Sequence, residues 1–295
     1  MIRLLTLLAV CLLASGPVLA ESVQMQHKQL QINAELVKAA GEWPAKRVVL
    51  LTHGTLAHGK MEIVSSLQSL LAENDVASLA PTLSLGINNR QGMYDCAMPH
   101  THRHADALEE IGAWVDWLKY QGVEEVVLMG HSRGGNQTAW FAAKRDDKQV
   151  SKIVLLAPMT WNADSEYSSY KERYKNDIQP LLSKAESMMQ SGKGDTMLSM
   201  DFIYCPKAQA SAKSVVSYYK DDKRRDTPAL LTMLNKPVLL ITGSEDNVVK
   251  NLDNRGAKLA QQGVIEHVEI EGADHFFRDI YAEEVVEGVV AFLDK

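Results

Sequence analysis

The sequence predicts one α/β domain in which helices cover both faces of a mostly parallel, doubly wound sheet. Two observations support this fold class: short apolar runs alternate with helix-length amphipathic stretches, and each run is continuously apolar. Continuous runs are typical of strands that are buried on both faces. A third observation, a long polar interval at about 159–236, predicts a helical cap insertion over one edge of the sheet.

The predicted elements follow one another in a β-α-β order that favours right-handed crossovers. Residues 24–37 partly alternate in polarity and predict a leading antiparallel edge hairpin. The strong strand candidates are 48–51, 126–129, 153–156 and 238–241, and the weaker ones are 76–80 and 266–270. Helices are expected at about 60–73, 104–120, 133–145, 250–262 and 280–293.

Composition excludes several classes of protein. The 295 residues carry a net charge of −6, so the basic surface that nucleic-acid binding needs is missing. Three cysteines are too few for a disulfide-stapled miniature fold. The sequence has no nucleotide-binding glycine loop, zinc-protease motif or paired C-x-x-C motif, so it supports neither a nucleotide-dependent enzyme nor a zinc protease.

Residues 1–20 have the layout of a secretory signal peptide. Arg3 precedes a short apolar run, Pro17 interrupts it, and Ala20 ends a small-residue cleavage site. We therefore expect cleavage near Ala20 and export to the periplasm or the medium, with residues 21–295 forming the mature domain; the alternative is an uncleaved N-terminal anchor. No later stretch is long enough to predict a membrane span, and the mature chain is expected to be soluble.

The sequence GHSRGG at 130–135 contains the pattern G-x-S-x-G. It directly follows a predicted strand and precedes a predicted helix, which is the context of a nucleophile elbow. Such a turn exposes a serine at the N-terminus of a helix, where negative charge is stabilised. Ser132 is therefore the candidate nucleophile, and the alternative is an inert serine in a glycine-rich turn.

A serine hydroxyl needs a base, and the base needs an orienting acid. His275 lies between the last weak strand and the last helix, and Asp246 follows the strand at 238–241. Both therefore come from strand ends, like Ser132. Glu245 is the neighbouring competitor for the acid, and Asp164 is a less favoured substitute.

The remaining requirement is a pair of amides that bind an oxyanion. Gly54 permits a tight turn after the strand at 48–51, so the amides of Thr55 and Arg133 are the candidate donors. His53 and His131 are candidates for contact with substrate, although His53 is expected mainly to orient its loop. The Arg133 side chain has two interpretations, a contact with an anionic substrate group or, more simply, a surface salt bridge.

The conjunction of these motifs resembles the α/β-hydrolase superfamily from about residue 45 onward. The HG loop, the GHSRGG elbow, the GSED acid turn and the GADH histidine turn occur in the order of that family. The resemblance implies the α/β-hydrolase fold, with Ser132 as nucleophile, His275 as base, Asp246 as acid, and no cofactor.

Other features stay open at this point. His100, His102 and His104 lie near the expected pocket rim and have three interpretations: metal ligands, contacts with substrate or, as we expect, surface or packing residues, so no metal site is predicted. Cys96 and Cys205 are a candidate disulfide between core and cap, with two buried thiols as the alternative. The charge run at 221–226 is expected to be solvated surface. Five tyrosines of the cap either line a pocket or, as we expect, pack within the cap: Tyr167, Tyr170, Tyr174, Tyr204 and Tyr218.

The sequence thus predicts an exported serine esterase, similar to carboxylesterases or lipases, that acts on a small-molecule ester or acyl substrate. A peptidase, amidase or thioesterase with the same triad is the alternative among enzymes. A binding protein with a hydrolase fold and no activity is the alternative from another class. The sequence predicts no particular oligomeric state.

Overall fold

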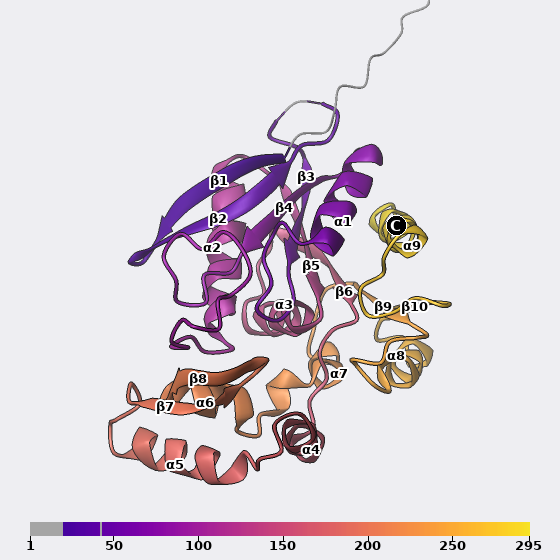
Figure 1. Ribbon diagram of the computed structural model, residues 1–295. Coiled ribbons are helices and arrows are strands. Elements are labelled where there is room, and N and C mark those ends of the chain that lie inside the picture. The colour runs from indigo at the N-terminus through magenta and orange to yellow at the C-terminus, as the bar shows by residue number, and fades with distance from the viewer. Residues whose placement is uncertain (1–19, 42) are drawn as a thin grey trace, which may run out of the picture.

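The computed structural model of the chain describes residues 20–41 and 43–295 (Figure 1). The predicted signal peptide therefore lies, except for Ala20, outside the described residues. An eight-stranded sheet runs in the order β1-β2-β4-β3-β5-β6-β9-β10. Its strands are β1 (Ala20–His27), β2 (Leu30–Val37), β3 (Arg47–Thr52), β4 (Ala77–Thr82), β5 (Glu125–His131), β6 (Val150–Leu156), β9 (Val238–Gly243) and β10 (Glu266–Ile270).

The sheet is parallel from β4 to β10, and only the β1–β2 hairpin and its pairing with β4 are antiparallel. This agrees with the mostly parallel sheet and the edge hairpin that the sequence predicts. The core helices are α1 (Glu62–Glu73), α2 (Asp106–Tyr120), α3 (Arg133–Lys144), α8 (Leu252–Gln261) and α9 (Ile280–Leu293). They begin and end within two residues of the predicted bounds.

The continuous apolar strands are buried on both faces. Along β3, Val48 and Leu50 pack on the side of α2 and α3, whereas Val49 and Leu51 pack on the side of α1 and α9. All four side chains are fully buried. The strand needs apolar residues at every position because each face carries a helical layer.

The chain between β6 and β9 forms a separate layer at the carboxyl ends of the strands (Figure 1). It consists of α4 (Ala163–Tyr174), α5 (Gln179–Gln190), β7 (Met197–Phe202), β8 (Cys205–Ser211), α6 (Ala212–Tyr219), the 3-10 helix η1 (Lys223–Arg225) and α7 (Thr227–Leu231). We call this segment, residues 159–236, the cap. The antiparallel β7–β8 hairpin is a feature that the sequence pattern did not predict.

The cap has its own apolar cluster, and this cluster includes side chains from the loop after β4. Tyr170, Phe202 and Tyr219 of the cap pack in one cluster with Leu83 and Leu85. The loop also pairs with the hairpin, because His100 forms an isolated parallel bridge to Ala210. A disulfide joins Cys96 of the same loop to Cys205 at the start of β8. The cap is therefore fixed to the core by packing, hydrogen bonds and a covalent link.

Candidate active site

Ser132 occupies a sharp turn between β5 and α3. Its backbone has φ 56° and ψ −124°, a conformation that non-glycine residues rarely adopt. The turn is tight enough to need glycine: a Cβ at Gly134 would lie 2.2 Å from the His53 carbonyl oxygen, and one at Gly130 would lie 2.6 Å from the Gly134 carbonyl oxygen. The two outer glycines of G-x-S-x-G are therefore required by close backbone contact.

The structure brings the three predicted triad residues together. His275 Nε2 lies 2.9 Å from Ser132 Oγ, and His275 Nδ1 lies 2.8 Å from Asp246 Oδ2. Because the carboxylate accepts, Nδ1 donates to it, and Nε2 is left to accept the serine proton. The side chains of His275 and Asp246 are only 5% and 6% exposed, so bulk water barely reaches the relay.

Asp246 is held as a carboxylate. Burial alone would raise the pKa of Asp246. The hydrogen bond and charge of His275, together with the amides of Val248 and Val249, outweigh burial and lower that pKa. Those two amides donate to Oδ1 at 2.7 and 2.9 Å. The neighbouring Glu245 and the distant Asp164 are both exposed, and neither hydrogen-bonds to His275.

His131 and His53 support the site from behind and do not line its cavity. His131 Nε2 donates to the His275 carbonyl at 2.8 Å, and Leu83 N donates to His53 Nε2 at 3.0 Å. Burial is the main reason that the pKa of each histidine falls to about 3, so both rings are neutral. Their predicted contact with substrate is replaced by a role in fixing the loops that carry the site.

The two candidate oxyanion donors are tied to each other through a side chain. Arg133 is the first residue of α3, and its Nε donates to Thr55 Oγ1 at 2.9 Å. Within the described chain, neither the Thr55 amide nor the Arg133 amide donates a hydrogen bond to another residue. Both amides are therefore available to an oxygen atom that develops negative charge beside Ser132.

A cavity of about 120 Å³ lies over Ser132 between core and cap. Its core side is lined by Thr55, Ser132, Arg133, Val248 and Val249. Its cap side is lined by Glu166, Arg173, Ile203, Tyr204, Tyr218 and Tyr219. Tyr204 and Tyr218 therefore reach the cavity, so for these two residues the alternative of pocket lining holds and the expectation of simple packing within the cap was wrong.

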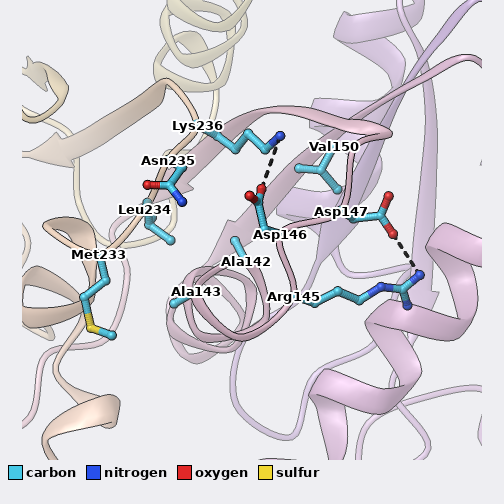
Figure 2. Close-up of a pocket in the computed structure, with 10 residues that line it drawn as sticks. All are labelled: Ala142, Ala143, Arg145, Asp146, Asp147, Val150, Met233, Leu234, Asn235 and Lys236. Carbon is cyan, nitrogen blue, oxygen red and sulfur yellow. Dashed lines mark ion pairs between the residues drawn. The ribbon is translucent and has the colours of Figure 1, made fainter.

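A second hollow, at the start of β6, has neither a hydroxyl or thiol nucleophile nor an imidazole among its lining residues. This pocket has a volume of about 30 Å³. Figure 2 shows its lining residues, among which Lys236 pairs with Asp146 and Arg145 with Asp147. It lies at the amino end of a parallel strand, opposite the strand ends that carry Ser132. None of the residues that line it is a serine, cysteine or histidine.

The three histidines of the loop after β4 are buried, and the ring of His102 links this loop to the cap. His100 Nδ1 lies 3.2 Å from His102 Nε2, and His102 Nδ1 lies 2.8 Å from the Tyr218 hydroxyl. His104 Nε2 lies 2.9 Å from Asn136 Oδ1. Within the part of the chain that the structure describes, no group of three metal-ligating side chains occurs.

The charge run at 221–226 is not simply solvated surface. Arg225 is 1% exposed, and its guanidinium lies 3.4 Å from the ring centre of Trp161. Asp226 pairs with Arg255, with contacts of 2.5 and 2.8 Å. The expectation of a solvated run was wrong because the 3-10 helix η1 turns the third basic residue inward under the cap.

The chain belongs to the α/β-hydrolase family. A family model described as the alpha/beta hydrolase fold matches residues 47–278, which is most of the chain. A Mycoplasma pneumoniae protein named as an esterase/lipase is 28% identical over 138 residues, which are 47% of this chain and 46% of that protein. The chain thus covers less than half of the length of that relative.

Further similarities agree with the fold. The bifunctional esterase/perhydrolase DCH of Acinetobacter calcoaceticus is 23% identical over 60% of this chain and 70% of its own. Among solved structures, Est1E from Butyrivibrio proteoclasticus with bound ferulic acid has a TM-score of 0.65 at 19% identity. That similarity covers 92% of this chain and 100% of Est1E. The Pyrococcus furiosus esterase PF2001 has a TM-score of 0.63 at 14% identity, covering 94% and 91%.

Proposed function

We propose that this protein is a serine hydrolase that cleaves a small-molecule ester through an acyl-enzyme intermediate. The observation that carries the proposal is the continuous relay Asp246–His275–Ser132, with contacts of 2.8 and 2.9 Å, at a strained turn beside a cavity. The named activities of the two curated relatives, an esterase/lipase and an esterase/perhydrolase, favour an ester over an amide.

The proposed reaction has two matching halves. Ser132 Oγ bonds to the carbonyl carbon while its proton passes to His275 Nε2, and the amides of Thr55 and Arg133 stabilise the oxyanion. The tetrahedral intermediate then breaks the bond to the alcohol, which leaves with the proton from His275. Water repeats the sequence on the acyl-enzyme and releases the acid. Asp246 stabilises the imidazolium that forms in each half.

The experiment is hydrolysis of p-nitrophenyl esters of increasing acyl length by the purified mature protein and by Ser132→Ala. The expected result is turnover by the wild type alone, with an acyl-length optimum set by the cavity. Turnover by the purified Ser132→Ala protein would refute the assignment of the nucleophile. Turnover of thioesters or amides in place of every ester would move the protein to the alternative substrate class.

We also propose that the protein is exported and cleaved near Ala20. The proposal is supported by the signal-like composition of residues 1–20 and by the disulfide, since disulfides persist in oxidising compartments. Expression of the full chain, cell fractionation and mass measurement of the N-terminal peptide test it. A peptide that begins near Glu21 in the periplasm or medium is expected, and an uncleaved cytoplasmic chain would contradict it.

A further inference from the structure

The side chain of Arg133 lies beside the nucleophile without a carboxylate partner. Its Nε donates to Thr55 Oγ1 at 2.9 Å, its Nη1 lies 3.3 Å from His104 Nδ1, and its guanidinium lies 5.3 Å from the ring centre of Tyr218. No carboxylate of the described residues forms an ion pair with it. The salt bridge expected from the sequence is therefore not formed within the described chain.

A guanidinium has five N–H donors, and these contacts use two of them. Arg133 is half-buried and lines the cavity together with Ser132. Its other donors are therefore open to a molecule in the cavity. A guanidinium fork in such a position is suited to binding a carboxylate through two parallel hydrogen bonds.

A second guanidinium strengthens the positive charge in this region. Arg225 is 1% exposed, and its Nε and Nη2 have no hydrogen-bond partner among the described residues. Its Nη1 donates to the Tyr218 carbonyl. Burial, followed by the charge of Arg133, lowers the pKa of Arg225 to about 10, which still leaves it cationic at neutral pH. Both guanidinium groups contact Tyr218, and their charges repel each other.

The charges that line the cavity itself also favour an anion. Arg133 and Arg173 line it, and Glu166 is the one carboxylate among its lining residues in the described chain. Arg173 donates to the Ile203 carbonyl at 3.3 Å and lies over the Tyr204 ring. Like Arg133, it forms no ion pair with a carboxylate of the described residues. A chain with a net charge of −6 therefore carries a locally positive cavity over its candidate nucleophile.

We propose that the substrate is an ester that bears a carboxylate a few bonds from the scissile carbonyl, and that the Arg133 guanidinium binds this carboxylate. The proposal rests on the proposed function, since it names the substrate class of the same site. The position of Arg133 immediately after Ser132 sets the short distance between the bound anion and the reacting carbon. A short dicarboxylic acid half-ester fits this description.

A purely structural role of Arg133 predicts a different result. If its side chain only positions Thr55 for the oxyanion, its removal slows the hydrolysis of neutral and anionic esters by the same factor. If it binds a substrate carboxylate, its removal lowers the ratio of kcat/KM for an anionic ester to kcat/KM for a matched neutral ester. The ratio therefore separates the two roles.

The test compares p-nitrophenyl hemiglutarate with p-nitrophenyl pentanoate on the wild type, Arg133→Gln, Arg133→Lys and Arg224→Gln. Arg224 is the matched control, because it is an exposed cap arginine paired with Asp222 outside the cavity. The wild type should prefer the anionic ester. Arg133→Gln should lower the ratio at least about tenfold, Arg133→Lys should restore part of it, and Arg224→Gln should leave it unchanged.

Two further measurements keep the inference testable. The wild-type preference should weaken with ionic strength, because the bound charges are partly screened by salt. Monomethyl glutarate should bind to Ser132→Ala more tightly than methyl pentanoate, as measured by calorimetry. An equal ratio in wild type and Arg133→Gln, or equal binding of the two esters, would overturn the inference while leaving the proposed hydrolase intact. Absence of all ester turnover would instead count against the proposed function, and the binding experiment would still decide the inference.

Discussion

The buried neutral histidines predict a protein that loses stability in mild acid. His53 and His131 are 1% and 4% exposed, and burial lowers the pKa of each from 6.5 to about 3. In the unfolded chain each ring takes up a proton as the pH falls through about 6.5. The folded state cannot follow until about pH 3, so lowering the pH in this window favours unfolding.

The magnitude follows from the two pKa values of each ring. Between about pH 7.5 and about pH 5.5, the uncompensated protonation of one unfolded histidine lowers the free energy of unfolding by about 1.4 kcal/mol. His53 and His131 together therefore contribute a loss of about 3 kcal/mol. Burial lowers the pKa values of His100, His102 and His104 as well, and these rings act in the same direction.

The assay is urea unfolding followed by circular dichroism at both pH values, on the wild type and on His131→Gln. A glutamine keeps an N–H for the His275 carbonyl but does not titrate. The free energy of unfolding of His131→Gln should therefore fall by about 1.4 kcal/mol less between the two pH values than that of the wild type. Glu110 is a buried carboxyl with a raised pKa and acts in the opposite direction, but it is present in both proteins. Equal pH dependence in the two proteins would refute the reasoning.

Three further predictions concern the triad, the elbow and the disulfide. Asp246→Asn should lower kcat for ester hydrolysis about 10³- to 10⁴-fold, because His275 loses the charge that orients it. Glu245→Gln, at an exposed position, should leave kcat unchanged, and similar rates in both variants would argue against the relay. Gly134→Ala should unfold at clearly lower urea because its Cβ meets backbone oxygen at 2.2 Å. Gly288→Ala, in an open position of α9, should gain about 0.5–1 kcal/mol, and equal effects would contradict this contrast. Reducing the disulfide, which spans 109 residues, should lower stability by about 2–5 kcal/mol in the same assay, and an unchanged midpoint would show that it carries no stability.

The central parallel strands could be predicted because each contains a continuous run of apolar residues. In β3 and β5 the alternating sides of the strand pack into two different apolar clusters, so burial on both faces leaves a clear pattern. Ser132, Asp246 and His275 could be predicted for a related reason. Each follows a recognisable strand, and the carboxyl ends of parallel strands meet at one edge of the sheet.

The cap could be predicted only as an insertion. The sequence of β8, CPKAQAS, contains few residues that favour strands, and its burial comes from packing against the rest of the cap and the loop after β4. The burial of Arg225 could not be predicted from the sequence, because charged runs are usually solvated. Glu166, Arg173 and Tyr219 were missed as lining residues because their approach to Ser132 depends on how the cap folds over the core.

The proposed mechanism requires that Ser132 becomes acylated during turnover. Rapid acid quenching of the mature protein with p-nitrophenyl ester, followed by peptide mass spectrometry, tests it directly. The account predicts one acyl group on the peptide that contains Ser132, present during turnover and lost when the ester is exhausted. Two results would contradict it: an enzyme that stays unmodified while it hydrolyses an ester whose acyl group is released slowly, or an acyl group on a different residue.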